Sequence, residues 1–222
     1  MNHILSENIG RLKFLMNINE ITDTNKLNLD AIKFYETVVP DSTDVMEVAN
    51  SWKGGGYVWG GGTGLGIPLM WTNPNTGKEE VLKDKQDKGT YCSGYALQVG
   101  YIVAKNRKLL QNKTKPQLLT FMKEWYQANP KTCVTAIINL GIGNEIKLED
   151  AEEGDFCQLW RTNDSGHNVI FKKFLYKDEK IIGIEYRSTQ TKTNGIGDNT
   201  EYFTNGGGKI KKDSTYFARL NK

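Results

Sequence analysis

The chain has 222 residues, a net charge of +3 with acidic and basic residues well mixed, and three cysteines. This length predicts a sizeable hydrophobic core, and cysteines without Cys-x-x-Cys or Cys/His spacing predict free thiols rather than a disulfide framework or a zinc site. The weak charge excludes a strong nucleic-acid footprint, and the absence of a long apolar run excludes membrane insertion.

The N-terminal residues lack the basic segment and apolar core of a secretory signal, so we expect the chain to be cytoplasmic on synthesis. An extracellular target would then be reached by lysis or through a dedicated secretion apparatus. Leu5, Ile9 and Leu12 recur at helical spacing around Ser6, which predicts a helix over residues 5–17, and one more helical turn is expected near 31–37. We therefore predict an N-terminal helical extension over 1–40 and one main domain over 41–222.

Helical patterns dominate the first part of the main domain. We expect a helix over residues 45–52, capped by Ser42 or Thr43, and a second helix that begins at Cys92 and buries one face. Two more are expected: one follows the N-cap Thr114 and is ended by Asn129-Pro130, and a short one over 133–140 is stopped by Gly141. Between the first two helices lie a glycine-dense stretch, 54–62, and an exposed loop or hairpin, 72–88.

Strand patterns dominate the second part. Residues 156–160, 168–175 and 181–186 are rich in β-branched and aromatic residues, a polar turn separates the last two, and 216–220 predicts a final strand. Helices followed by antiparallel strands indicate an α+β fold.

Cys92 is the leading candidate for a nucleophile. Placed at a helix N-terminus, its sulfur would face unpaired backbone N–H groups and the positive end of the helix dipole, which favour a thiolate. The alternative is a small apolar residue beneath the helix.

A thiol nucleophile needs a base, and the chain contains only two histidines. His3 lies at the terminus, whereas His167 opens a predicted strand and could meet Cys92 through the fold. If the face of the following strand that carries Tyr186 points to the helix of Cys92, then Gln190 or Ser188 could orient the imidazole, and we prefer Gln190.

These residues resemble the NlpC-like cell-wall cysteine peptidases, which are related to the CHAP amidases of the papain-like group. Residues 57–61 match the family's Tyr-x-Trp-Gly-Gly segment, and 92–94 match Cys-Ser-Gly at a helix start. Gly154-Asp155 and Gly166-His167 match the family's Gly-Asp and Gly-His motifs. Tyr91 stands where the family has an aspartate, and the third catalytic position is not a plain histidine.

The resemblance implies a papain-like, NlpC-like catalytic domain over 41–222, with an N-terminal helical part and a C-terminal antiparallel sheet. It implies Cys92 as the nucleophile and His167 as the base, with the polar residue of the next strand as orienting group. It also implies that Tyr57, Trp59 and Ser93 contact substrate. Neither a metal nor an organic cofactor is implied.

The expected activity is hydrolysis of amide bonds in peptidoglycan stem peptides, with peptidoglycan or a peptide as the substrate. A phage-type lysis enzyme, an injected effector with an inhibitor or immunity protein as partner, and a recycling enzyme all fit this expectation. Two alternatives use the same scaffold: a catalytically silent peptide- or glycan-binding module, and a toxin that deamidates or acyl-transfers onto host proteins.

Overall fold

The structure, a computed structural model, describes residues 40–57, 68–83, 90–127 and 130–222. The two helical segments expected in the N-terminal extension, and Trp59, lie outside the described residues.

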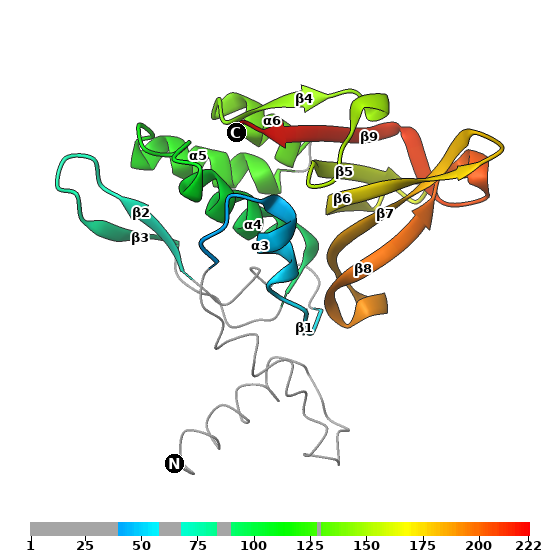
Figure 1. The fold of residues 1–222 in the computed structure, drawn as a ribbon, viewed down its shortest axis with the longest axis horizontal. Coiled ribbons are helices and arrows are strands. Elements are labelled where there is room, and N and C mark those ends of the chain that lie inside the picture. Colours follow the sequence, from blue (N-terminus) through cyan, green and yellow to red (C-terminus); the bar gives the residue numbers. More distant parts are fainter. Residues whose placement is uncertain (1–39, 58–67, 84–89, 128–129) are drawn as a thin grey trace, which may run out of the picture.

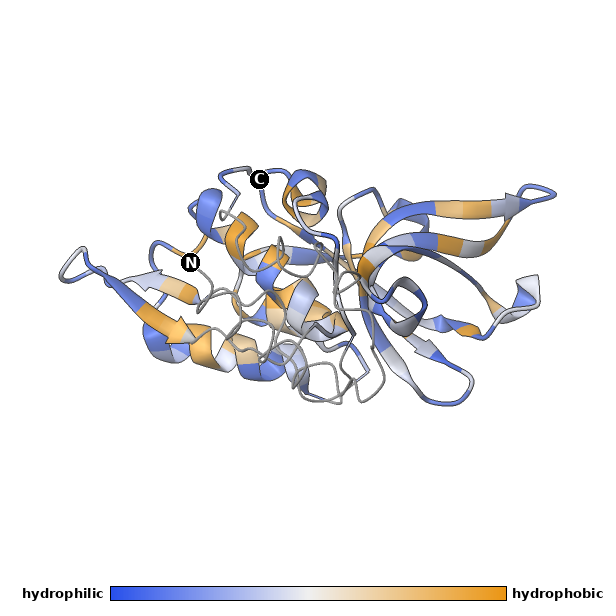
Figure 2. Ribbon diagram, turned by 90° about the horizontal axis from the view of Figure 1, so that it is seen from below, coloured by the Kyte–Doolittle hydropathy of each residue, from blue (hydrophilic) through white to orange (hydrophobic). Residues whose placement is uncertain are grey.

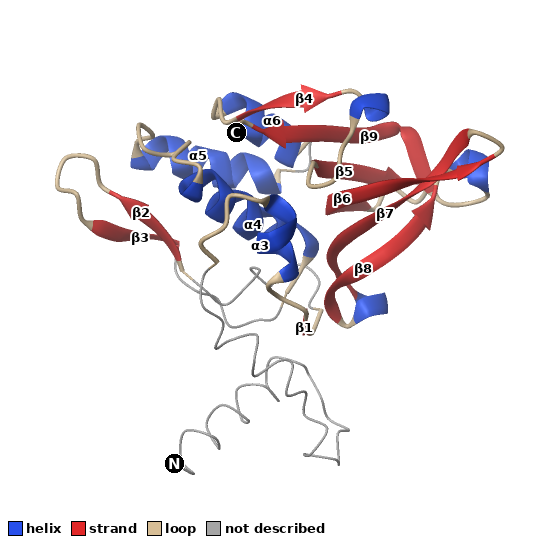
Figure 3. Cartoon of the chain, viewed as in Figure 1, coloured by secondary structure: helices blue, strands red, loops and turns tan. Residues whose placement is uncertain are grey.

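Helices and strands follow one another in nearly separate halves of the chain (Figures 1 and 3). The helices are α3 (Val45–Asn50), α4 (Cys92–Asn106), α5 (Lys115–Tyr126) and α6 (Cys133–Asn139), with short 3-10 turns η2 (Leu148–Asp150), η3 (Thr191–Thr193) and η4 (Thr204–Gly206). The strands are β1 (Gly54–Gly55), β2 (Leu69–Thr72), β3 (Glu79–Lys83), β4 (Gly143–Ile146), β5 (Phe156–Arg161), β6 (Gly166–Lys177), β7 (Lys180–Gln190), β8 (Gly195–Tyr202) and β9 (Ile210–Leu220).

Within the described residues, seven strands form one antiparallel sheet in the order β1-β8-β7-β6-β5-β9-β4, and the helices gather against it, as Figure 3 shows. The α+β prediction is therefore confirmed. The sequence did not predict β8, whose glycines and Asp-Asn pair are poor strand formers. Its pairing with β7 along the whole strand, from Tyr202 opposite Gly183 to Gly195 opposite Gln190, overrides that local preference.

Helix α4 is the central element of the helical half. Every residue from Gly94 to Ala104 is buried, whereas the sequence predicted one buried face. The helix is covered on all sides because it lies between α3, α5 and the sheet. Gly100 permits the close packing, since a Cβ there would lie 3.1 Å from Trp125 and 3.3 Å from Phe156. No helix in the described part of the chain combines the length and apolarity needed to cross a membrane.

The helix ends agree with the sequence prediction except at α3. Thr114 caps α5 in a reciprocal capping box with Gln117, and Gly141 follows α6 with a φ of 69°. At α3, however, the N-cap is Asp44, whose carboxylate accepts the Glu47 N–H at 2.8 Å, so the prediction of Ser42 or Thr43 was wrong. The longer reach of the carboxylate and its charge both favour the helix start.

The sheet is covered on both faces. One core cluster joins the helices to inward residues of the sheet such as Phe156 and Ile170, and a second lies on the other face around Tyr186, Phe203 and Phe217. Figure 2 shows apolar residues concentrated in helices and inner strands, while the turn of the protruding β2–β3 hairpin is hydrophilic. That hairpin is one of the two forms expected for residues 72–88.

The face of β7 that points to the helices is not the face with Tyr186 that was considered from the sequence. Arg187 points to the helices, where its guanidinium donates to Ala49 O at 3.0 Å and to Trp52 O. Tyr186 instead packs in the second cluster. Along the body of the strand, the Tyr186 face therefore does not meet the condition under which Gln190 and Ser188 were considered.

Candidate active site

The start of α4 is held by Thr90. Its backbone N–H and its hydroxyl both bond to Gly56 O, at 3.2 Å and 2.6 Å, and a parallel bridge pairs Thr90 with Tyr57. The first part of the glycine-dense stretch is thereby fixed beside the residues that lead into Cys92.

Thr90 also reaches the sheet. Its hydroxyl lies 2.6 Å from the Thr189 hydroxyl, and both side chains are fully buried. Since the single Thr90 proton goes to Gly56 O, Thr189 is the donor of this second bond. Because Gln190 follows Thr189, this contact places the end of β7 next to the start of α4.

Cys92 is the first residue of α4, as predicted. Tyr91 is the N-cap in extended conformation (φ −144°, ψ 160°), and the first intrahelical bond runs from Tyr95 N to Tyr91 O at 3.0 Å. The N–H groups of Cys92, Ser93 and Gly94 precede that bond and have no intrahelical acceptor. They provide a set of donors beside the sulfur.

The Cys92 thiol is acidic. Burial acts to raise its pKa, but the charge of His167 and a hydrogen bond from its ring outweigh burial, with smaller help from the Asn168 N–H and the Ser93 hydroxyl. The net result lowers the pKa of Cys92 to about 6. The lowered pKa favours the thiolate form of the sulfur beside the His167 ring.

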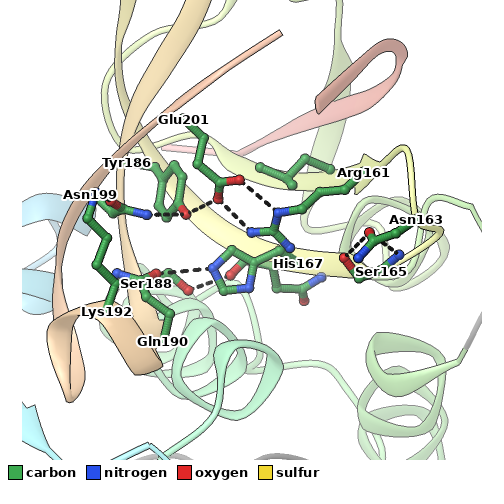
Figure 4. A network of polar contacts seen from close by, with 12 residues as sticks. Arg161, Asn163, Ser165, His167, Tyr186, Ser188, Gln190, Lys192, Asn199 and Glu201 are labelled. Carbon is green, nitrogen blue, oxygen red and sulfur yellow. Dashed lines mark hydrogen bonds and ion pairs between the residues drawn. The ribbon is translucent and has the colours of Figure 1, made fainter. Parts of the chain in front are cut away.

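The ring of His167 is oriented by Gln190, whose Oε1 lies 3.2 Å from His167 Nε2 (Figure 4). The Gln190 amide is itself oriented, because its Nε2 donates to Thr193 Oγ1 at 2.9 Å while the Thr193 hydroxyl donates to Gly195 O. The oxygen of Gln190 must then face the ring, so Nε2 of His167 carries a hydrogen and Nδ1 is left to exchange a proton with Cys92.

Ser188 directs its hydroxyl to a different partner. Its buried hydroxyl donates to Asn168 O at 2.7 Å, between β7 and β6. The register that pairs Ile170 with Arg187 brings His167 opposite Gln190 when continued to the strand ends. Of the two orienting groups expected, only Gln190 lies at the right level of the strand.

A second polar layer lies behind His167, and the sequence did not predict it (Figure 4). Arg161 forms a two-pronged ion pair with Glu201, with Nε 2.7 Å from Oε2, and the Tyr186 hydroxyl donates to the same carboxylate. The Tyr186 ring meets the His167 ring edge-on, with centroids 5.5 Å apart. An arginine at the end of the largely apolar strand β5 was the available signal.

Two of the three residues expected to contact substrate, Tyr57 and Ser93, lie in the described part of the chain. Tyr57 is partly buried, and burial, reinforced by the nearby negative charge of Cys92, raises the pKa of its phenol. The Ser93 hydroxyl lies 3.8 Å from the Cys92 sulfur. Both side chains therefore lie near Cys92, whereas Trp59 lies outside the described residues.

Tyr91, which stands where the resembled family has an aspartate, packs against Tyr126. The two rings are nearly parallel, at 25° and 6.0 Å between centroids. Burial raises the pKa of both phenols. Each phenol also affects the pKa of the other, and Cys92 affects both. This side of the nucleophile is thus formed by two neutral aromatic side chains.

The other two cysteines are free, as the sequence predicted, and both are buried. Burial raises the pKa of Cys133 to about 12 and that of Cys157 well above its usual range. Both thiols remain protonated and unreactive at neutral pH. In the part of the chain that the structure describes, no three His, Cys, Asp or Glu side chains gather as a metal site would require.

The site thus joins a thiolate at a helix start, an imidazole from β6 and an amide from the end of β7, an arrangement suited to nucleophilic attack on a carbonyl carbon. Comparison of the chain with protein-family models, curated proteins and solved structures finds no match.

Proposed function

We propose that this protein is a papain-like cysteine hydrolase that cleaves amide bonds, with peptidoglycan stem peptides as its substrate. The observation that carries the proposal is the Cys92–His167–Gln190 chain: a thiol with a pKa of about 6 beside an imidazole whose other nitrogen bonds to an amide oxygen at 3.2 Å.

Acylation starts from the thiolate–imidazolium pair. The Cys92 sulfur attacks the carbonyl carbon, a C–S bond forms, and the C–N bond of the amide breaks. His167 gives the proton on Nδ1 to the leaving nitrogen, which departs as an amine. Gln190 keeps the ring in the orientation that this transfer requires.

Deacylation returns the enzyme to its starting state. His167 takes a proton from water, the resulting hydroxide attacks the thioester carbonyl, and the Cys92 thiolate leaves from the carboxylic acid product. No co-reactant other than water is needed. In both steps the oxyanion would be held by the free backbone N–H groups at the start of α4.

The substrate class rests on the resemblance in sequence order: Tyr57 and two glycines before the cysteine, Cys92-Ser93-Gly94 at a helix start, and His167 at a strand start. The aromatic pair Tyr91 and Tyr126 supports a subsite for an uncharged part of the stem peptide, because phenols with raised pKa offer no charge to pair with an ammonium or carboxylate.

The test is incubation of the protein with purified peptidoglycan of several chemotypes, followed by labelling of newly formed amines. We expect amine release by the natural protein and a loss of at least about a thousandfold in the Cys92→Ala variant, since the nucleophile is removed. Thermal unfolding of the variant checks that its fold is retained.

The alternatives give different outcomes. A binding module would retain affinity for peptidoglycan and release no amine, with or without Cys92. A protein-modifying toxin would leave every wall chemotype intact yet release ammonia from, or transfer an acyl group to, a protein substrate in a Cys92-dependent manner. Either result would overturn the peptidoglycan hydrolase proposal.

A further inference from the structure

The ion pair of Arg161 and Glu201 lies beside the proposed base and has no part in the chemistry described above. Both side chains are largely buried, at 19% and 21% exposed, and come from different strands, β5 and β8. Because water screens partly buried charges poorly, each charge of this pair acts on neighbouring groups, and the opposite charge of its partner largely cancels that effect.

Tyr186 connects this pair to His167. Its hydroxyl donates to Glu201 and accepts from Asn199 Nδ2 at 3.0 Å, which fixes the ring that meets His167 edge-on (Figure 4). The charge of His167 in turn acts on the Glu201 carboxyl, and that of Arg161 acts on Tyr57, which also lies near Cys92. The pair and the reacting groups therefore share one electrostatic environment.

We propose that Glu201 and Arg161 are positioning residues that act as a charge-compensating pair, which sets how firmly His167 holds its proton and fixes its ring through Tyr186. The proposal rests on the proposed function only in taking His167 as the base.

The physical argument concerns the groups that face His167 from each neighbouring element. Cys92 from α4 contributes a negative charge, Arg161 from β5 a positive one and Glu201 from β8 a negative one, while Tyr186 and Gln190 from β7 are neutral. Removing Glu201 leaves the guanidinium uncompensated, which disfavours the imidazolium. Removing Arg161 leaves the carboxylate uncompensated, which favours it.

The test is a pH titration of the imidazole signals by NMR. The chain has only two histidines, so His167 is assigned by the signal lost in a His167→Ala variant. We expect Glu201→Gln to lower the His167 titration midpoint and Arg161→Gln to raise it, each by about 0.3 to 1 pH unit, and the double variant to return near the natural value. A merely structural role would not produce shifts of opposite sign.

Glu185→Gln is the matched control, because this carboxylate on β7 pairs with Lys172 and Lys173 instead. It should leave the midpoint within about 0.1 pH unit. Tyr186→Phe keeps the ring and both charges, so it should broaden the orientation of His167 with a smaller shift of the midpoint. Should either charge variant fail to fold, the sign of the shift in the remaining one decides.

Shifts of the same sign in both charge variants, or no shift in a folded Glu201→Gln protein, would overturn the inference. The titration needs no substrate. Loss of amine release with normal opposite shifts would therefore count against the proposed function alone.

Discussion

At the residue scale, Gln190 and Ser188 lie on the same face of β7 but have different partners. Gln190 bonds to His167, whereas Ser188 bonds to the backbone of Asn168. We expect Gln190→Ala to lower kcat/KM for peptidoglycan roughly tenfold to a hundredfold, because an imidazole that is free to rotate spends less time aligned with Cys92. Steady-state kinetics of amine release measures the change.

Ser188→Ala is the matched control for that change. It removes a buried hydrogen bond and should lower the free energy of unfolding by about 1 kcal/mol while leaving kcat/KM within about threefold. An equal loss of rate in both variants would show that the orientation of His167 does not depend on Gln190.

The three cysteines also differ at this scale. Burial acts on all of them, but only Cys92 has a hydrogen-bonded histidine that reverses its effect. The helix start alone does not make the difference, since Cys133 is the first residue of α6 and the pKa of its thiol is raised. The interaction with His167 therefore distinguishes Cys92 from the other two cysteines.

At the element scale, Thr90 joins three segments: the glycine stretch through Gly56, the start of α4, and β7 through Thr189. We expect Thr90→Val to lower the free energy of unfolding by roughly 1 to 3 kcal/mol, because the substitution keeps the shape but removes the acceptor of the buried Thr189 hydroxyl and leaves Gly56 O with only the backbone N–H bond. It should also lower kcat/KM, because Tyr57 and Gln190 lose their common support.

Denaturant unfolding and amine-release kinetics measure these two effects. Thr90→Ser retains the hydroxyl and should behave like the natural protein in both. A Thr90→Val variant with unchanged stability and rate would show that these bonds do not hold the site together.

At the scale of the whole molecule, the ion pair of Asp155 and Arg219 ties the last strand into the sheet. Asp155 is buried, accepts from Arg219 Nε at 2.7 Å and also accepts the Glu152 N–H at 2.8 Å. Because β9 joins the edge strand β4 to β5, loss of this contact weakens the attachment of the last two strands to the rest of the sheet. We expect Asp155→Ala to lower the free energy of unfolding by about 2 to 4 kcal/mol.

Equilibrium unfolding in urea measures this loss. Lys211 lies on the same strand as Arg219 and pairs with the exposed Asp164. Its replacement by alanine should change the free energy of unfolding by no more than about 0.5 kcal/mol. Equal effects of the two substitutions would mean that the burial of Asp155 has no energetic importance.

Much of the element pattern could be predicted because it is local. The capping box at Thr114, the glycine after α6 and the placement of Cys92 at a helix start follow from side chains within a few residues of each other. Strand β8 could not be predicted, because pairing with β7 forms it against its own composition. The N-cap of α3 was misjudged among adjacent polar residues that all can cap a helix.

Residue type and periodicity were enough to predict the α+β order of elements, the candidate nucleophile Cys92 and its candidate base His167. The polar groups that surround His167 became known only from the folded arrangement. The helices cover the Arg187 face of β7 and not the Tyr186 face. Gln190 still meets the His167 ring, through the register of β6 and β7. Three further side chains come together from three strands: Arg161, Glu201 and Tyr186. Contacts between residues so far apart in sequence depend on strand register and sheet twist, which no local pattern specifies.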